Sequence, residues 1–481
     1  MIQSRTHNCN ELRLSDAGKN VTIVGWYENI RKVSKNLGFL ILRDFYGTTQ
    51  VVIETEEMMQ VIDSVNKEST ISVTGVVRER SSKNKDLATG EIEVVPEKIE
   101  ILGKCIYNAL PFEINQSKDA DENTRLKYRY LDLRNPAVKG NIVLRSKIVA
   151  ELRQKMNSLN FMEITTPILT CSSPEGARDY LVPARNHPGK FYALPQAPQQ
   201  FKQILMASGF DRYFQIAPCF RDEDARADRS PGEFYQLDME MAFASQEDVF
   251  SVVEEVLPPV FEKYGVYKTA SKAPFVRIPY LESMDKYGSD KPDLRIDLVL
   301  QDATEVMADC GFGPFEGQTV KAIVVDGFTA TRKVIDGICA EVEVQTANKA
   351  FWFKLDENGE LVGGISKFLQ DRKEAVIAAL GLKPGDFVGL TAGKKLAAQK
   401  TAGVLRKLLG AASDKHMKKD CYEFCWIVDF PMYEIGEESG ELEFCHNPFS
   451  MPQGGMDALN NQDPLGILAY QYDLVSVSYT H

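Results

Sequence analysis

The residues best placed to do chemistry lie between positions 213 and 243, where two extended segments flank a densely charged loop. Residues 213–220 are apolar and aromatic, as in a buried strand, and residues 234–243 alternate between polar and apolar side chains. This pattern predicts an antiparallel hairpin. Successive side chains of a strand point to opposite faces, so one polar face should meet the mouth of the loop. The residues concerned are Gln236, Asp238 and Glu240 on the strand, and Arg221 and Glu223 at the loop.

An arginine beside carboxylates is suited to bind an anion. The planar guanidinium donates parallel hydrogen bonds, so Arg221 could bind a ligand carboxylate or phosphate through two of them. The same residues fit a solvated polar face of an edge hairpin equally well. The pattern by itself leaves both interpretations open.

The sequence FRDED at 220–224, with ADRSPGEFYQLDME at 227–240, resembles motif 2 of the class II aminoacyl-tRNA synthetases, in particular the bacterial-type aspartyl branch. The resemblance implies that Arg221 holds the α-phosphate of ATP and the amino-acid carbonyl. It implies that Glu223, next to Asp222, contacts the adenine. The expected activity is ATP- and Mg²⁺-dependent formation of aspartyl-adenylate from L-aspartate, followed by transfer to tRNA(Asp), with tRNA(Asn) as an open second acceptor.

Other segments match the amino-acid site of this family. The segment SSPEGARDYLVP at 172–183 has the composition of a loop, and the resemblance implies that Glu175 contacts substrate. Gln199 and Lys202 share a helical face, and the resemblance implies that Lys202 pairs with the side-chain carboxylate of aspartate. We expect a neutral ligand to leave that buried ammonium unpaired, at a cost of several kcal/mol. Asp238 belongs to the same expected site.

The segment ELEFCHNPFSMP supplies the last expected substrate residue, His446, which matches a family histidine near the amino-acid carboxylate. A structural histidine is the alternative. Two positions depart from the family pattern: Ala197 stands where a serine is often found, and Asn447 where a second histidine is frequent. These departures leave one contact to the amino group and the discrimination between tRNAs open.

Residues 20–104 contain β-rich segments separated by turns, which predicts a small closed barrel of the OB-fold type. OB-folds bind single-stranded nucleic acid by stacking bases on aromatic side chains. The resemblance implies that Phe39 stacks on an anticodon base, Gln50 hydrogen-bonds a base and Glu93 reads the wobble guanine. A core position for Phe39 is the alternative. The segments are 21–27, 39–43 with 48–53, 70–78 and 92–101, with a helical stretch at 56–65.

Between barrel and hairpin the sequence predicts a polar linker at 113–123, a basic segment and a helix at 138–156. The basic segment could contact a phosphate backbone, with a solvated linker as the alternative. The helix and the following MEITTPILT resemble family motif 1, which implies a homodimer formed near Pro167. A core helix is equally consistent. The cations of the basic segment are Arg125, Lys127, Arg129 and Arg134.

With 481 residues, 44% of them apolar, and a net charge of −12, the chain should form about three globular domains. The negative charge argues against nonspecific coating of nucleic acid but not against a local basic groove. No signal pattern and no apolar run of about 18 residues occur, so we expect a cytoplasmic protein without membrane spans. The nine scattered cysteines lack the pairs of a zinc site and indicate reduced, mostly buried thiols.

The resemblance extends over residues 1 to about 475 and implies a multidomain α+β protein. Its parts are an N-terminal OB-fold β-barrel, a class II catalytic domain built on an antiparallel sheet, and an inserted α+β domain. The expected boundaries are 1–110 for the OB-fold anticodon-binding domain, 111–135 for a hinge, 136–296 for the catalytic domain with motifs 1 and 2, 297–418 for the inserted bacterial-type domain, and 419–481 for the incomplete remainder of the catalytic domain.

After AYQYDLV the chain reads SVSYTH where the family pattern would continue, so we expect a truncated enzyme. Asp473 would then be a Mg²⁺ ligand without its partner carboxylate, and the arginine of motif 3 would be missing. Two functions compete: an aspartate–tRNA ligase, and a non-catalytic remnant that binds tRNA. An asparaginyl-tRNA synthetase is disfavoured by Lys202 and by the inserted domain.

Overall fold

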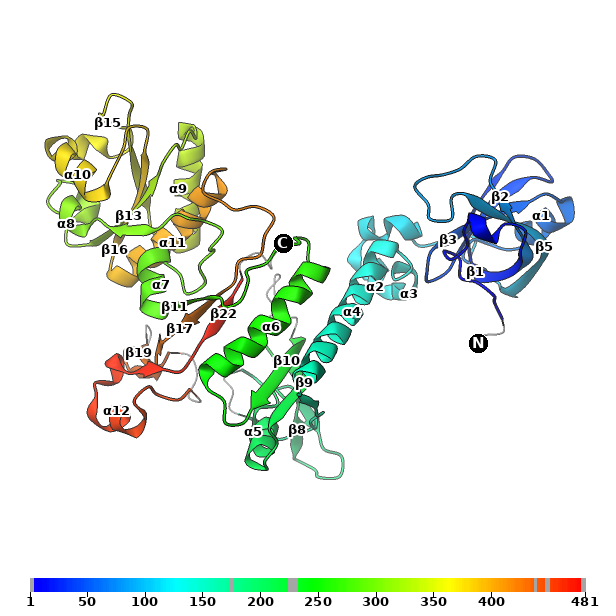
Figure 1. Ribbon diagram of the computed structural model, residues 1–481, viewed down its shortest axis with the longest axis horizontal. Coiled ribbons are helices and arrows are strands. Elements are labelled where there is room, and N and C mark those ends of the chain that lie inside the picture. The colour runs from blue at the N-terminus through cyan, green and yellow to red at the C-terminus, as the bar shows by residue number, and fades with distance from the viewer. Residues whose placement is uncertain (1–3, 174–176, 224–231, 437–438, 446–449, 477–481) are drawn as a thin grey trace. The chain divides into compact units, whose positions relative to one another are not determined.

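Figure 1 shows the computed structural model of the chain, which describes residues 4–173, 177–223, 232–436, 439–445 and 450–476. The chain forms two compact units, Met1–Arg145 and Ser146–His481. Helix α4 (Pro136–Ser158) begins in the first unit and ends in the second. Each unit contains hydrophobic clusters of its own.

The first unit is built on a closed five-stranded barrel with strand order β1-β2-β3-β5-β4. Alternating side chains fill its interior, where Ile23, Leu40 and Val73 are fully buried. The predicted OB-fold is confirmed, and every predicted strand is present. The elements are β1 (Asn20–Lys32), β2 (Gly38–Arg43), β3 (Thr48–Ile53), α1 (Glu56–Asp63), β4 (Thr70–Glu79) and β5 (Ile92–Gly103).

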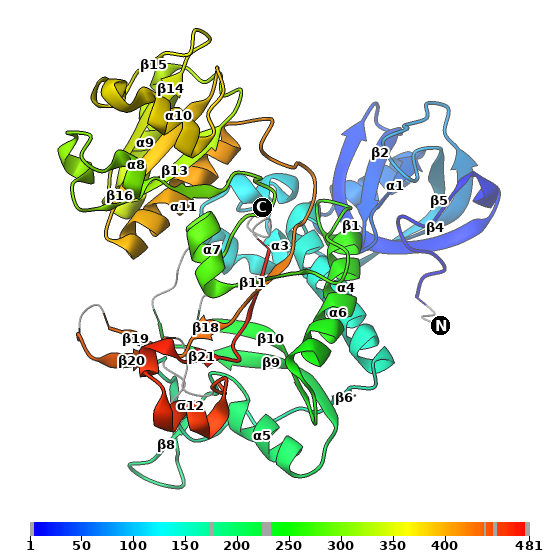
Figure 2. The same cartoon turned by 60° about the vertical axis from the view of Figure 1, so that its left-hand side comes forward.

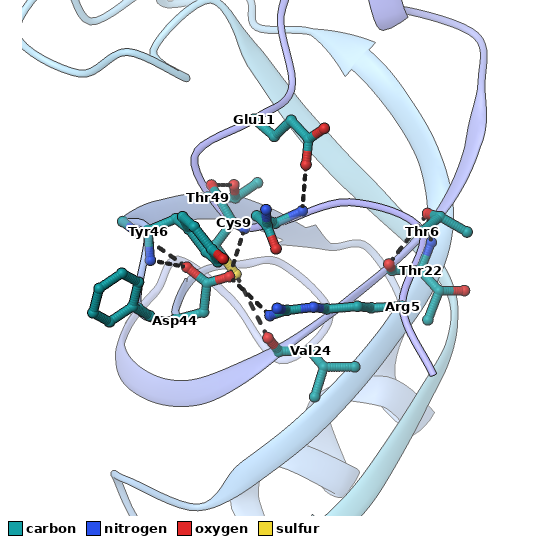
Figure 3. A network of polar contacts seen from close by, with 12 residues as sticks. Arg5, Thr6, Cys9, Glu11, Thr22, Val24, Asp44, Tyr46 and Thr49 are labelled. Atoms are coloured by element: carbon teal, nitrogen blue, oxygen red, sulfur yellow. Dashed lines mark hydrogen bonds and ion pairs between the residues drawn. The ribbon is translucent and has the colours of Figure 1, made fainter. Parts of the chain in front are cut away.

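The segment before β1 is fastened to the barrel by the buried carboxylate of Asp44 (Figure 3). Asp44 follows β2 and accepts hydrogen bonds from the backbone N–H groups of Tyr46 at 2.7 Å and Cys9 at 3.0 Å. The guanidinium of Arg5 lies 3.4 Å from the same carboxylate. A carboxylate in this position needs such donors because burial removes its water. The N-terminal segment is thereby held against the barrel.

Short helices replace the polar linker predicted at 113–123. They are a 3-10 helix, η2 (Ile114–Asp119), and the helices α2 (Glu122–Lys127) and α3 (Arg129–Asp132). Burial acts to raise the pKa of Asp132, but Ser117 and two arginines outweigh it, and the pKa is lowered. Three of the four basic-segment cations have carboxylate partners within the unit: Arg125 and Arg129 pair with Asp132, and Arg134 pairs with Glu68. These ion pairs favour a hinge held by its own charges over an open phosphate-binding surface.

Helix α4 contains the predicted helix 138–156, but the strand after it is shorter than expected. Strand β6 covers only Met162–Glu163 and pairs parallel with β9. After β6 the Ile164 N–H still donates to the Phe214 carbonyl at 3.0 Å, and Pro167 follows beyond the end of the strand. The adjacent apolar residues Ile168 and Leu169 are exposed at 43% and 54%. A dimer contact near Pro167 therefore stays a prediction.

The central hairpin is present as predicted. Strands β9 (Arg212–Phe220) and β10 (Glu233–Met241) pair antiparallel, with Asp238 opposite Gln215 and Glu240 opposite Tyr213. Strand β10 ends before Phe243, which has a φ of +54° and is fully exposed. Helix α6 (Gln246–Tyr264) and helix α4 share one hydrophobic cluster with the hairpin. The buried members of that cluster are Met156, Phe161, Phe214, Val252 and Val256.

A second three-stranded sheet has the order β11-β17-β22. Its strands are β11 (Val276–Pro279), β17 (Cys425–Val428) and β22 (Asp473–Val475), the first two paired parallel and the last two antiparallel. Glu254 of α6, only 6% exposed, fastens this sheet to the helix. Its Oε1 accepts hydrogen bonds from the Phe275 backbone at 3.0 Å, from Arg277 at 2.6 Å and from the Trp426 indole at 2.9 Å.

The region predicted as an insertion forms a five-stranded sheet of order β12-β13-β16-β14-β15 (Figure 2). One face packs on α9 and α11, and the opposite face on α8 and α10. Helix α7 precedes this region. The elements are α7 (Tyr280–Tyr287), β12 (Leu300–Asp302), α8 (Thr304–Met307), β13 (Thr319–Val325), α9 (Arg332–Thr346), β14 (Ala350–Leu355), β15 (Leu361–Val362), α10 (Lys373–Leu380), β16 (Phe387–Gly393) and α11 (Lys395–Ala411).

All nine cysteines are free thiols, but only Cys9, Cys219 and Cys425 are buried, so the expectation of mostly buried thiols is wrong. Burial raises the pKa of Cys425 to about 12, which keeps this thiol protonated and unreactive. Within the described ranges, no helix has the length and apolar character needed to cross a bilayer.

Replacing Glu254 by alanine should lower the free energy of unfolding of the second unit by about 3 kcal/mol, because the change leaves a partly buried Arg277 and an indole N–H without their acceptor. Urea denaturation followed by tryptophan fluorescence measures this loss. The matched control is Glu255→Ala, which alters an exposed carboxylate one position along the same helix. Equal stability of the two variants would contradict the role given to Glu254.

Candidate functional site

The hairpin and helix α5 (Gln199–Ala207) bring a cation between two carboxylates. The Lys202 ammonium lies 2.9 Å from Oδ1 of Asp238 and 3.0 Å from Oε1 of Glu240. The two acids stand two positions apart on β10 and therefore point to the same face. The Lys202 side chain is 13% exposed, so the interaction is largely shielded from water.

The two carboxylates change the pKa values of the groups beside them. Burial acts to lower the pKa of Lys202, but Asp238 and Glu240 outweigh it, and the pKa is raised. Burial and the charge of Asp238 raise the pKa of Tyr213, so this phenol stays neutral. Oδ2 of Asp238 is buried and has no hydrogen-bond partner within the described residues. A buried acceptor without a donor is uncommon, and it marks a place for a ligand N–H.

The cluster opens into a cleft of about 680 Å³, lined by Lys202, Glu240 and Tyr472 among others. Burial and then Glu240 raise the pKa of Tyr472, which is a neutral hydrogen-bonding wall of the cleft. Sequence reasoning had placed Glu240 on the polar face without giving it a role, and it missed Tyr213 and Tyr472. The strict alternation along residues 234–243 was the signal for Glu240.

Arg221 lies at the other end of the same hairpin face. Its backbone N–H donates to Gly232 at 2.8 Å, and its guanidinium carbon lies 5.1 Å from the centre of the Phe234 ring. Nε of Arg221 is buried and has no hydrogen-bond acceptor in the part of the chain that is described. Phe234 and Asp238 share one strand face at a separation of about 13 Å, from four residues of strand rise. The face therefore carries the carboxylate of Asp238 at one end and the guanidinium of Arg221 at the other.

Asp222 and Glu223, both predicted to bind ATP, with Glu223 on the adenine, are exposed at the mouth of the loop. The backbone of Asp222 is fixed, because its N–H donates to the Arg178 carbonyl at 2.9 Å and its own carbonyl accepts from Arg178 Nε at 2.9 Å. Gln199 is half-buried at the start of α5. Glu175 and His446 lie outside the described residues.

Gln196 is a structural part of this region that sequence reasoning missed. Its side chain is 1% exposed and accepts a hydrogen bond from the Ala177 N–H at 3.1 Å. Its amide donates to the Ala177 carbonyl at 2.8 Å and to Asp179 at 2.6 Å. Gln196 therefore holds residues 177–179 of the predicted substrate loop.

The structure does not place Asp473 in the cleft of Lys202. Asp473 lies 3.7 Å from the Lys291 ammonium, and both line another cleft. Searched over the described residues, the chain contains no cluster of three histidine, cysteine or acidic side chains that could hold a metal. The assignment of Asp473 to Mg²⁺ stays a prediction.

On the barrel, the three predicted nucleic-acid residues lie on the neighbouring strands β2, β3 and β5, and Glu93 is only 6% exposed. Phe39 is half-buried, with the Arg31 guanidinium 4.8 Å from its ring centre. The Gln50 amide donates to Glu93 at 3.0 Å. Glu93 also accepts from Arg78 at 2.8 Å, and Arg78 is its register partner on β4. Arg78 was missed because its pairing joins residues far apart in sequence.

The family model for class II tRNA synthetases (D, K and N) matches residues 121–479, and the model for the OB-fold nucleic acid binding domain matches residues 21–102. With most of its length matched by the first model, the chain belongs to the class II tRNA synthetases of the aspartate, lysine and asparagine group. Its domains thus pair a synthetase core with a nucleic-acid-binding barrel.

Among the relatives, the aspartate–tRNA ligase of Streptomyces avermitilis is 50% identical over 480 residues, which cover 99% of this chain and 81% of that protein. The aspartate–tRNA(Asp/Asn) ligase of Rickettsia felis is 49% identical over 490 residues, with the same coverage. The asparaginyl-tRNA synthetase of Pyrococcus horikoshii, solved with asparaginyl-adenylate, has the same fold, with a TM-score of 0.50 and 19% identity over 86% of this chain and 98% of that one.

Replacing Glu240 by glutamine should lower the pKa of Lys202, because one of the two carboxylates that raise it is lost. Carbamylation by cyanate as a function of pH, read by mass spectrometry at Lys202, measures the change, since only the neutral amine reacts. The Lys202 ion pairs stabilise the fold below the ordinary pKa of lysine, and this stabilisation is lost as pH rises through the raised pKa.

The control for this measurement is Glu282→Gln, which removes the partner of the exposed Lys286 and should leave the reactivity of Lys202 unchanged. An unaltered profile in the Glu240 variant would mean that Glu240 does not act on Lys202.

Proposed function

We propose that the chain is an aspartate–tRNA ligase, which activates L-aspartate with ATP and transfers it to tRNA. The observation that carries this proposal is Lys202, a shielded ammonium between Asp238 and Glu240 on the hairpin face that also holds Arg221. The names of relatives that are about half identical over nearly the whole chain support aspartate as the amino acid.

In the first step, a carboxylate oxygen of aspartate attacks the α-phosphorus of ATP, the bond to pyrophosphate breaks, and aspartyl-adenylate forms. Arg221 neutralises charge on the α-phosphate, and its buried Nε, which lacks an acceptor in the described chain, fits this task. Asp222 and Glu223 lie on the adenine side. In the second step, a ribose hydroxyl of tRNA attacks the carbonyl carbon and AMP leaves.

Mg²⁺ supplies charge neutralisation to the phosphates of ATP when it is bound. We propose Asp473 as a protein ligand to this ion, because Mg²⁺ commonly takes one or two carboxylates and completes its shell with phosphate oxygens and water. The Lys291 ammonium lies 3.7 Å from Asp473 and also pairs with Asp290.

Specificity for aspartate needs a different explanation from the one expected from sequence. A neutral ligand does not leave Lys202 unpaired, because Asp238 and Glu240 already satisfy its ammonium. Aspartate is preferred when its side-chain carboxylate takes over part of this pairing and its ammonium donates to the unpartnered Oδ2 of Asp238. Binding of aspartate thus replaces part of the ion pairing between Lys202 and the two acids with ion pairs to the ligand.

We propose that the barrel binds the anticodon of tRNA(Asp), and that of tRNA(Asn) as a second acceptor, through Phe39, Gln50 and Glu93. The OB-fold match and the relatives named for both tRNAs support this. Glu93 is held by Gln50 and Arg78, so its carboxylate is fixed before a base arrives.

Further parts of the proposal rest on the family resemblance. Glu175, Gln199 and His446 contact the amino acid, and the protein works in the cytoplasm as a homodimer. Exposed apolar residues beside Pro167 support the dimer. The inserted sheet supports a domain at 297–418, flanked by catalytic segments 136–296 and 419–481 and preceded by the barrel at 1–110 and the hinge at 111–135.

Replacing Lys202 by methionine should raise the KM for aspartate far more than the KM for ATP, because the change removes a cation that faces only the amino acid. Aspartate-dependent ATP–pyrophosphate exchange measures both constants. Lys286→Met, on an exposed ion pair, is the control and should change neither. A parallel rise of both constants would assign Lys202 a structural role, and absence of exchange in the unaltered protein would count against the ligase itself.

Replacing Phe39 by alanine should weaken tRNA(Asp) binding by about 1–3 kcal/mol through the loss of base stacking. The control is Phe45→Ala, which removes an exposed phenylalanine just after β2. Fluorescence anisotropy with labelled tRNA gives both affinities. Equal affinities of the two variants would show that Phe39 does not contact RNA.

A further inference from the structure

Helix α11 of the inserted region meets helix α7 through their backbones, and the two helices lie side by side in Figure 2. A Cβ atom on Gly403 would lie 2.3 Å from the Gly288 carbonyl oxygen, and one on Gly288 would lie 2.2 Å from the Gln399 carbonyl oxygen. Glycine inside a helix is destabilising relative to alanine, but here only glycine permits the contact. The Gln399 side chain donates to Asp285 of α7 at 2.6 Å.

Arg406, one turn further along α11, holds the chain that follows α7. Its side chain donates to the backbone carbonyls of Asp293 at 3.1 Å, Ile296 at 2.5 Å and Leu298 at 2.6 Å. Arg406 is 2% exposed and its guanidinium lies 4.9 Å from the ring centre of Tyr287. Burial lowers the pKa of Arg406 to about 10, with Asp293 acting in the opposite direction. A rigid guanidinium that binds three carbonyls fixes the path of that backbone.

The segment fixed in this way, residues 288–296, carries a cation of the synthetase part. Lys291 lies in it, in an ion pair with Asp290 of the same segment and 3.7 Å from Asp473 of β22. Lys291, Asp473 and the α11 residues Lys400 and Lys407 line one cleft of about 900 Å³. Lysine is a common phosphate ligand. The residue before Asp473, Tyr472, lines the cleft of Lys202, so the two clefts are bordered by neighbouring residues of the chain.

A purely structural arginine is available for comparison in the same region. Arg372 also donates to three backbone carbonyls, but all of them lie within the insertion, at Val306, Ala308 and Asp309. The carbonyls bound by Arg406 include Asp293 and Ile296, which precede the insertion. Arg406 therefore links the inserted region to the synthetase part, and Arg372 does not.

We propose that Arg406 is a positioning residue through which the inserted region holds residues 288–296, and with them the Lys291–Asp473 pair, in place to bind the phosphates of ATP. The identity of this ligand rests on the proposed function. Aspartate binding, which depends on Lys202 of α5 and on β10, is not coupled to Arg406.

The test compares Arg406→Gln with the matched control Arg372→Gln in the full chain. Isothermal titration calorimetry gives the Kd for ATP and for aspartate, and hydrogen–deuterium exchange reports on residues 288–296. Arg406→Gln should weaken ATP binding about tenfold, an ordinary size for coupling through a packed element, and speed exchange in this segment. It should leave aspartate affinity unchanged, and Arg406→Lys, which keeps the charge, should recover part of the loss. Arg372→Gln should change neither ATP affinity nor exchange at 288–296.

Equal effects of the two glutamine variants, or faster exchange at 288–296 with unchanged ATP affinity, would overturn the proposal. If Arg406→Gln does not fold, Arg406→Lys is measured in its place against Arg372→Lys, with the same expected difference. Failure of the unaltered protein to bind either ATP or aspartate would count against the proposed function, and unchanged exchange at 288–296 in the Arg406 variants would still refute the positioning role.

Discussion

The charge balance of Lys202 is the constraint on which the synthetase part depends. A shielded ammonium needs carboxylates beside it, and Asp238 and Glu240 supply them from alternate positions of β10. A slip of one residue in the register of the hairpin would turn both acids to the opposite face. The register of β9 and β10 is therefore required by the site as well as by the core, where Tyr213 and Phe214 are fully buried.

The same balance limits which ligands the cluster accepts. Lys202 contributes one positive charge and the two acids contribute two negative charges, a sum of −1 (+1 − 2 = −1). The net negative charge of the cluster repels a ligand that has only a carboxylate. An amino acid also has an ammonium, which can pair with the acids while its carboxylate pairs with Lys202, so the net charge of the site does not become more negative. Lys202 alone provides limited discrimination between an acid and its amide, since it is already paired. The remaining selectivity has to come from groups beyond this cluster.

Patterns within short segments predicted most of the strands and helices. The features that were not predicted depend on contacts between residues that are distant in the sequence. Alternation indicated the barrel strands and the polar face of the hairpin, because strand periodicity is local. The pairing of Arg134 with Glu68, which helps turn a presumed basic linker into a hinge held by its own ion pairs, joins residues 66 positions apart. The Arg78–Glu93 and Gln196–Ala177 contacts are likewise tertiary. Family motifs located Lys202 and Arg221, but the pairing of Lys202 with Asp238 and Glu240 became evident only from the geometry.

The inserted region shows how a domain with its own core can still act on its neighbour. Its sheet is packed on both faces by its own helices, so it gains little stability from the synthetase part. The joint instead consists of specific polar and backbone contacts: Gly288 and Gly403 where α7 and α11 meet, the Gln399–Asp285 hydrogen bond, and the carbonyls of Asp293 and Ile296 bound by Arg406. Directional contacts of this kind define geometry more sharply than apolar packing does. A joint built in this way is suited to holding the segment that carries Lys291 in one place.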